Sequence, residues 1–168
     1  KISGSGFYFL KGNLAMLDLA LQRFALDTII AKGYTPVIPP YMINRKSYEE
    51  VTDLADFEKV MYKIEDDDAY LIATAEHPMA AMYQDEIFEE KDLPLKMVGV
   101  SPCFRREIGA HGLDSRGLFR VHQFTKIEQF IYCMPEDSWK YHEELLANAE
   151  EIFTKLELPY HVVNICTG

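Results

Sequence analysis

Residues 118–133 read LFRVHQFTKIEQFIYC, and their alternation predicts a long β-strand. One set of alternate positions forms an expected core face: Phe119, Val121, Thr125, Ile127 and Ile131. The other set mixes cations, a carboxylate and an aromatic ring: Arg120, His122, Phe124, Lys126 and Glu128. Such a mixture suits the floor of a ligand site, and a solvated face of an antiparallel sheet has the same pattern.

This strand is one arm of a predicted hairpin that sets the fold class. Residues 95–104 are the other arm, and a polar, glycine-containing loop spans 108–117. Long amphipathic helices are expected at 13–32, capped by Asn13 and ended by a left-handed Gly33, and at 135–156. Hairpin strands with helices between them predict an α+β fold, an antiparallel sheet with flanking helices.

Shorter elements complete the single domain that we expect. Residues 35–38 predict a strand, and Pro39-Pro40 after it places that strand at a sheet edge or in an unusual pairing. Residues 60–64 and 69–73 predict a hairpin with an acidic tip. A short helix is expected to start near Thr74, and a final strand at 160–165.

The charge of the chain is acidic overall but uneven. The formal net charge is -10, which disfavours nonspecific nucleic-acid binding because affinity for phosphate backbones rests on Lys and Arg. Residues 49–92 hold 15 acidic residues against three lysines, whereas four of the six arginines lie between Arg105 and Arg120. A local cationic patch in an acidic chain indicates a site for a small anion such as a nucleotide phosphate.

Several other function classes have no support in the sequence. Neither a GxGxxG dinucleotide motif nor a GxxxxGK[ST] phosphate loop occurs, and the three cysteines show no metal-ligand spacing or disulfide framework. No signal peptide opens the chain, and no apolar run is long enough to span a bilayer. We therefore expect a cytoplasmic protein with no membrane association and no metal site within these residues.

Two pairs of residues on the predicted hairpin suit nucleotide and amine recognition. Phe124 and Glu128 share a strand face and emerge roughly 13 Å apart, so a ring could stack on a base while a carboxylate grips an amine. Arg105 and Glu107 share parity after the first arm, where a guanidinium could hold a phosphate and a carboxylate accept from an exocyclic amine. A cross-strand ion pair is equally compatible with this spacing.

Three segments, in order, resemble the motifs of class II aminoacyl-tRNA synthetases. Phe-Arg-Arg-Glu at 104–107 with Arg-Gly-Leu-Phe-Arg-Val-His-Gln-Phe-Thr-Lys-Ile-Glu at 116–128 resembles motif 2, in the detail of the seryl enzymes. Thr-Ala-Glu-His-Pro at 74–78 resembles their Thr-x-Glu serine-recognition segment. The helix ending at Gly33, followed by Tyr-Thr-Pro-Val-Ile-Pro-Pro-Tyr at 34–41, resembles the dimer-forming motif 1, with Pro40 in its proline position.

The resemblance implies a role for individual residues. Arg105, as the catalytic residue, would hold the ATP α-phosphate and the serine carboxylate, while Glu107 would bind the adenine amine. The implied ATP-binding set is Arg105, Arg106, Glu107, Val121, His122, Gln123 and Phe124, with Phe124 stacked under the adenine. The implied serine-binding set is Thr74, Ala75, Glu76, Arg105 and Glu128. Alternation turns the Val121 side chain toward the core, so only its backbone would reach the base, and we expect His77 to be local structure beside Pro78.

The resemblance also implies a reaction and its partners. Serine would be activated by ATP, with Mg²⁺, to seryl-adenylate and transferred to tRNA(Ser) by a homodimer assembled through motif 1. Residues 1–168 would form a partial class II catalytic domain without the N-terminal tRNA-binding arm and motif 3 of the seryl enzymes. We expect such a fragment to be inactive alone.

Other assignments share part of this evidence. Prolyl- and threonyl-tRNA synthetases have the same motif layout, although Glu128 and the Thr-x-Glu segment favour serine. A synthetase-like ligase that charges a carrier protein would differ in its acceptor, which an aminoacylation assay identifies. An inactive fragment or regulatory paralogue is the third alternative, and the intact Arg105, Glu107 and Phe124 argue against lost catalysis.

Overall fold

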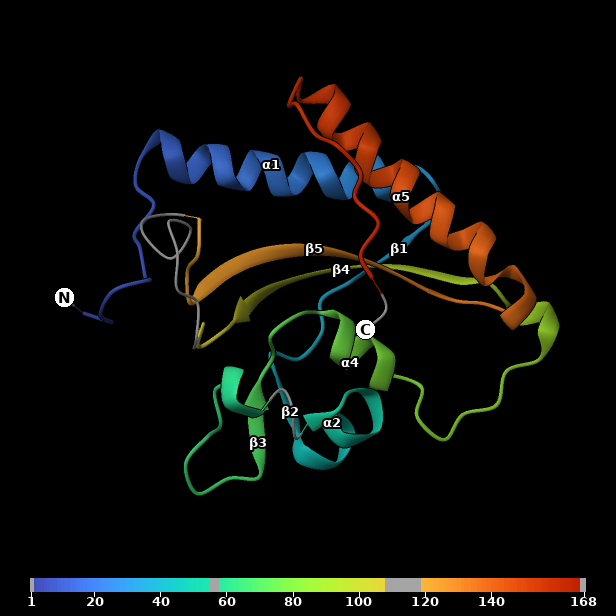
Figure 1. Ribbon diagram of the computed structural model, residues 1–168, viewed down its shortest axis with the longest axis horizontal. Coiled ribbons are helices and arrows are strands. Elements are labelled where there is room, and N and C mark those ends of the chain that lie inside the picture. The colour runs from blue at the N-terminus through green and yellow to red at the C-terminus, as the bar shows by residue number, and fades with distance from the viewer. Residues whose placement is uncertain (1, 55–57, 108–118, 167–168) are drawn as a thin grey trace.

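A computed structural model describes residues 2–54, 58–107 and 119–166 of the chain (Figure 1). Its main sheet has the strand order β1-β4-β5, where β1 is Thr35–Val37, β4 is Leu95–Phe104 and β5 is Gln123–Tyr132. The β4–β5 ladder is antiparallel from Leu95↔Tyr132 to Phe104↔Gln123. The predicted hairpin pairing and the α+β class are confirmed.

The edge strand β1 departs from the antiparallel expectation because it runs parallel to β4. Thr35 pairs with Met97 and Val37 with Gly99. Parallel neighbours need a long crossover, and residues 38–94 between the two strands provide one. Within the described residues β1 lies at the edge of its sheet, as the prolines after it predict.

Two long helices, α1 (Asn13–Ile30) and α5 (Ser138–Lys155), cover one face of the main sheet (Figure 1). Their shared core is built around Ile29 of α1 and Val98 of β4, with Ile127 of β5 packed against them. A 3₁₀ turn, η4 (Pro135–Asp137), precedes α5, so the helix predicted from residue 135 begins slightly later.

The ends of α1 correct one prediction and confirm another. Asn13 does not cap the helix, because it is already helical and Gly12 occupies the cap position without a side-chain hydrogen bond. Gly33 has a φ of +89°, the left-handed conformation predicted for it. The chain therefore leaves α1 through a turn that suits glycine.

The short helix α4 (Glu76–Ala81) packs on the opposite face of the sheet, where a helix near Thr74 was predicted. Its first turn lies directly on β4. A Cβ atom at Gly99 would come within 2.9 Å of the Ala75 Cβ and of the Met79 side chain. Gly99 thereby allows the segment that enters α4 to approach the sheet closely.

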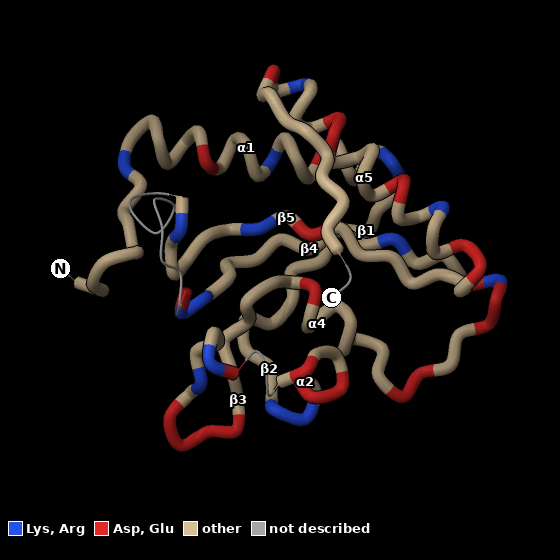
Figure 2. Tube along the Cα trace, viewed as in Figure 1, with Lys and Arg blue, Asp and Glu red and all other residues tan. Residues whose placement is uncertain are grey.

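A smaller lobe lies on the same side of the sheet as α4 (Figure 1). It contains the antiparallel pair β2 (Met42–Asn44) and β3 (Ala69–Leu71), the helix α2 (Arg45–Val51) and the 3₁₀ turn η1 (Glu58–Val60). A further 3₁₀ turn, η2 (Glu90–Asp92), precedes β4. The core of this smaller lobe is formed by Tyr48, Leu54, Met61, Tyr70 and Ala73. Acidic residues gather on this lobe and on the chain that leads from α4 to β4 (Figure 2).

The hairpin predicted for 60–64 and 69–73 is only partly present. Its arms share one isolated bridge, Lys63↔Tyr70, and β3 forms its ladder with β2 instead. The arms still share two backbone hydrogen bonds, from the Ile64 amide to the Ala69 carbonyl oxygen and from the Leu71 amide to the Tyr62 carbonyl oxygen. Asp66 in the acidic tip has a φ of +61°, as a tight turn requires.

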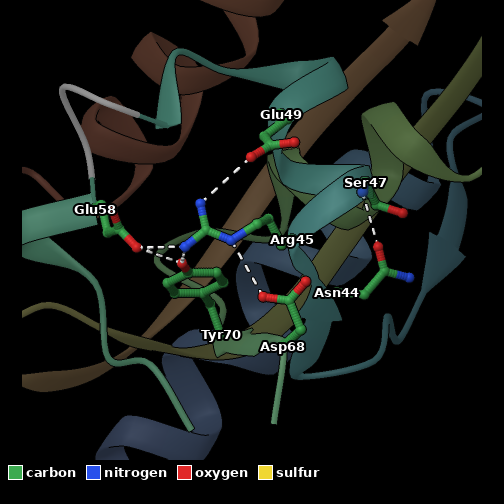
Figure 3. A network of polar contacts seen from close by, with 7 residues as sticks. All are labelled: Asn44, Arg45, Ser47, Glu49, Glu58, Asp68 and Tyr70. Atoms are coloured by element: carbon green, nitrogen blue, oxygen red, sulfur yellow. Dashed lines mark hydrogen bonds and ion pairs between the residues drawn. The ribbon is translucent and has the colours of Figure 1, made fainter.

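Arg45 ties this lobe together through several polar contacts at once (Figure 3). Its guanidinium donates to Glu58 at 2.6 Å, to Asp68 at 3.1 Å and to Glu49 at 3.3 Å. Tyr70 also donates to Glu58, at 2.5 Å. The Arg45 cluster, defined as these five residues, fixes β3 and therefore the segment that follows it toward Thr74.

Three other predictions have different outcomes. The strand predicted at 160–165 is wrong, because these residues are exposed and have no ladder partner in the described part of the chain. The strand predicted from residue 118 starts only at Gln123. The loop at 108–117 lies outside the described residues. No helix in the described ranges has the length and apolarity needed to cross a bilayer.

Candidate active site

The first part of the site is the contact between the Arg105 and Phe124 side chains. The Arg105 guanidinium carbon lies 5.2 Å from the centre of the Phe124 ring, in cation–π geometry. The Arg105 Nε donates to the Ala73 carbonyl oxygen at 3.2 Å, and the Arg105 amide donates to the His122 carbonyl oxygen at 2.9 Å. These side-chain contacts are neutral, so they hold Arg105 in place without cancelling its charge.

The second part is a cluster of Thr74, Lys126 and Glu128. The Thr74 hydroxyl donates to Glu128 Oε2 at 2.7 Å and accepts from Lys126 Nζ at 3.1 Å. Lys126 also forms an ion pair with Glu128, two residues along the same face of β5. The Glu76 amide donates to the Thr74 Oγ1 at 3.2 Å. The hydroxyl of Thr74 is therefore fully engaged, with one acceptor and two donors.

The two parts border a common cavity. A hollow of about 410 Å³ is lined by residues of both, including Thr74, Glu76, Arg105 and Lys126. Glu107 and Arg120 line it as well and form an ion pair with each other. The cross-strand pair that spacing alone allowed is thus present, and it lies at the rim of the cavity.

A second hollow, of about 810 Å³, opens on the Phe124 side. It is lined by Arg105, Glu107, Val121 and Phe124 together with Tyr8, Leu10 and Asp18. The prediction that Val121 turns toward the core is wrong. The reason is local: β5 starts at Gln123, so the strand alternation does not extend back to residue 121.

The remaining members of the implied ATP set are placed less directly. The His122 ring stacks on Phe7 with centroids 5.2 Å apart, and its Nδ1 lies 2.8 Å from the Arg105 carbonyl oxygen. The Arg106 amide donates to the Val60 carbonyl oxygen at 2.8 Å. Gln123 borders a smaller hollow of about 170 Å³ beside Phe124. His122 and Arg106 therefore support the site through their contacts with neighbouring residues.

Ala75 and His77 flank the Thr-x-Glu segment. Ala75 is fully buried against α4 and β4. The His77 ring meets Tyr48 edge-on at 5.0 Å, and its Nδ1 is buried without a hydrogen-bond partner among the described residues. Burial, then the nearby Lys126 and Arg105 charges, lowers the pKa of His77. Its packing agrees with the expected local structural role, although it also lines the 410 Å³ cavity.

Sequence reasoning gave no role to four residues at the site. Alternation placed Lys126 on the predicted ligand face together with Glu128. That shared face was the available signal for their ion pair, which was not predicted. Tyr8, Leu10 and Asp18 reach the larger hollow from the start of the chain and from α1. Nothing in their local sequence indicates this, because the hollow joins segments more than 80 residues apart.

The chain is similar to known proteins in both sequence and fold. The family model of the tRNA synthetase class II core domain (G, H, P, S and T) matches residues 60–168. The chain belongs to this family. The match covers β3, α4, the β4–β5 hairpin and α5, which carry the two parts of the site described above.

Three relatives of this class II core domain are named serine–tRNA ligase or seryl-tRNA synthetase. Serine–tRNA ligase of Methanocorpusculum labreanum is 92% identical over the whole chain, which covers 40% of that protein. The seryl-tRNA synthetase of Pyrococcus horikoshii, solved in complex with ATP, is 61% identical with a TM-score of 0.95, over 99% of this chain and 37% of that one. The cytoplasmic serine–tRNA ligase of Naegleria fowleri, solved with AMP, is 43% identical with a TM-score of 0.85, over 91% and 36%.

This class II core domain thus spans about 40% of the length of the curated relatives it matches. Its described residues contain no group of three or more His, Cys, Asp or Glu side chains that could hold a metal ion. Mg²⁺, which the resemblance implies, finds no such ligand set here. Its involvement remains a prediction from the sequence.

Proposed function

We propose that the protein carrying this chain activates serine with ATP to form seryl-adenylate and transfers the seryl group to tRNA(Ser). The observation that carries the proposal is the Thr74–Glu128 hydrogen bond of 2.7 Å beside Arg105 and Phe124. Thr74 lines one cavity with the Arg105 guanidinium, and its hydroxyl is bonded to the Glu128 carboxylate, so these groups offer partners for both ends of an amino acid. The serine–tRNA ligases among its relatives support the same substrate.

The nucleotide end of the site is the larger hollow. Phe124 offers an aromatic face on which a purine can stack, and Glu107 is a carboxylate near it that can accept from an exocyclic amine. Arg105 lines both hollows and would hold the α-phosphate between the two ends. The P. horikoshii relative is described in complex with ATP, which supports ATP as the nucleotide here.

The amino-acid end of the site is the 410 Å³ cavity lined by Thr74, Glu76 and Lys126. Glu128 and Thr74 would receive the serine ammonium group, and Glu76 would border the side-chain hydroxyl. A site built to hydrogen-bond a hydroxyl rejects the analogue that lacks it, because its own polar groups are then left unpaired. We therefore propose that serine is selected over alanine by these contacts.

The reaction needs positioning more than reactive side chains. A carboxylate oxygen of serine attacks the α-phosphorus of ATP, the new P–O bond forms, and the bond to the bridging oxygen breaks to release pyrophosphate. Arg105 touches both reacting groups in this arrangement and offsets the charge that develops on the phosphate. No proton has to be moved at this step, since both reacting groups are already ionised.

Homodimer formation through the motif 1 region is the second proposal for this protein. The α1 helix leaves several large apolar side chains exposed: Leu14, Met16, Leu17, Leu19 and Leu21. A helix with this many large apolar side chains exposed is typical of a subunit interface. We also propose a cytoplasmic location, in keeping with a role in translation.

The test of the substrate is ATP–pyrophosphate exchange by the full-length protein with a panel of amino acids. Serine is expected to drive exchange far better than threonine, proline or alanine. A preference for threonine or proline would assign the protein to one of those synthetase types. Transfer to a carrier protein rather than to tRNA would contradict the proposed acceptor.

A further inference from the structure

Lys126 occupies the place that the serine ammonium group needs. Among the described residues it is the one lysine that lines the 410 Å³ cavity. Its ammonium contacts both Thr74 and Glu128. These are the two residues that would receive the substrate ammonium under the proposed function. A protein ammonium and a substrate ammonium cannot hold the same Thr74 and Glu128 lone pairs at once.

We propose that Lys126 is an internal placeholder that serine displaces, and that it then binds the substrate carboxylate. The amino acid would insert between the two charges of the ion pair, with its ammonium on Glu128 and its carboxylate facing Lys126. The inference rests on the proposed function and adds a residue that determines which ligands the site accepts.

The number of unpaired charges does not change when serine inserts between Lys126 and Glu128. Before binding, Lys126 neutralises Glu128, with the lysine side chain 32% exposed and the glutamate side chain 18% exposed. A zwitterion brings one positive and one negative group, so each protein charge still has a partner afterwards. An amine without a carboxylate leaves Lys126 unpaired beside Arg105, which is unfavourable in a half-buried site.

The surroundings of Lys126 allow this movement. On the same face of the sheet its cross-strand neighbour is Ser101, and that of Glu128 is Gly99, so no large side chain of β4 stands next to the pair. Its side chain lies at the cavity wall with Arg105. A flexible point charge can exchange partners at little cost, whereas a bidentate arginine is held by its geometry.

Charges facing Lys126 in the cavity favour an anionic ligand group beside it. Arg105, Arg120 and the carboxylate of Glu76 line the same cavity, and Arg120 is already paired with Glu107. Arg105 contacts a carbonyl and an aromatic ring, which do not cancel its charge. A carboxylate placed between Lys126 and Arg105 would therefore satisfy both.

The test compares two ligands in direct binding to the full-length protein. Serine carries both charged groups, while ethanolamine keeps the ammonium and hydroxyl groups of serine without the carboxylate. Lys126→Met is expected to tighten ethanolamine about threefold to fivefold, because the competing ion pair is gone, and to weaken serine about tenfold. Lys46→Met makes the same change at a largely exposed lysine of α2 and should alter neither affinity.

Opposite shifts for the two ligands would support the placeholder role, and a shift in the same direction for both would overturn it. Lys126→Gln is measured alongside in case the methionine variant folds poorly, with thermal melting to check each protein. Ethanolamine binding requires no turnover. A protein that fails to activate serine would contradict the proposed function, whereas an active protein in which both ligands shift in the same direction would contradict only the role of Lys126.

Discussion

Two clusters of this molecule combine a cation, a carboxylate and a hydroxyl, yet they differ in what they can do. Arg45 is held by Glu58, Asp68 and Glu49, with Tyr70 completing the ring of contacts (Figure 3). Lys126 is held by Glu128 alone among carboxylates of the described residues, and Thr74. Both clusters border a hollow, since Arg45, Glu49 and Glu58 line one of about 650 Å³ and Thr74 and Lys126 line the one of about 410 Å³. The first cluster also joins β3 to α2 and η1.

The choice of cation explains the difference. A guanidinium binds several acceptors in a fixed fork, and removing any one leaves the others in place. A lysine ammonium on a flexible chain binds as a point charge and can change partners. We infer that the Arg45 cluster positions the Thr-x-Glu segment permanently, while the cluster at Thr74, Lys126 and Glu128 opens for the substrate.

The largest expected effect comes from Glu128→Gln. Loss of this carboxylate removes the partner of the substrate ammonium and leaves Lys126 without its own, so serine-dependent kcat/KM should fall at least about a hundredfold. Pyrophosphate exchange at varied serine concentration measures it. Glu58→Gln makes the same change in the Arg45 cluster and should preserve exchange per folded molecule. Equal losses in both variants would remove the distinction between the clusters.

Phe124→Ala tests the nucleotide end of the same site. An aromatic platform under a base is worth about 1–3 kcal/mol, so the KM for ATP should rise roughly tenfold to a hundredfold, provided that it follows binding. The serine KM should change much less. Phe153→Ala on α5, a residue that lines neither hollow, serves as the matched control. An ATP KM unaltered by Phe124→Ala would leave the Phe124 ring a purely structural role.

Most of the architecture could be predicted from local sequence. The 95–104 strand is confirmed at both ends, and the two long helices and the α4 position are also confirmed, because each depends on periodicity within one segment. Alternation also separates the core and ligand faces within β5, although Phe119 and Thr125, expected on the core face, are exposed. Ile127 packs under α1 and α5, while Phe124 and Lys126 face the cavities.

What could not be predicted depends on partners distant in sequence. The parallel pairing of β1, the pairing of β3 with β2 and the ring of carboxylates around Arg45 all join segments whose contacts leave no local signal. Val121 was misplaced because the strand begins at Gln123, five residues later than the alternation from residue 118 suggested. The strand predicted at 160–165 had the right composition, but a ladder also requires a neighbouring backbone.

Arg45→Met tests whether the other cluster is structural. The variant loses contacts to three carboxylates, and its melting temperature should fall by several degrees while exchange per folded molecule changes little. Arg45→Lys should recover only part of that loss, since an ammonium cannot reproduce the fork. Arg23→Met, which breaks an exposed pair on α1, is the control. Complete rescue by lysine would show that charge alone holds the lobe.

The smallest effect concerns the acid stability of the same lobe. Hydrogen bonds from Tyr70 and then Arg45 hold the pKa of Glu58 below its usual value of 4.5. A lowered pKa in the folded state means that this contribution is complete above about pH 4.5 and is lost as the pH falls through the folded value. Glu58→Gln should therefore flatten the stability profile below pH 4.5 in thermal melts. An unchanged slope there would show that Glu58 is not coupled to folding.

A crystal structure of the full-length protein with serine and a non-hydrolysable ATP analogue tests the central claim most directly. We predict the serine ammonium on Thr74 and Glu128, Lys126 moved to the carboxylate, and the Arg45–Glu58 contact unchanged from 2.6 Å. A bound serine with Lys126 still paired to Glu128, or an amino acid seated away from Thr74, would contradict it.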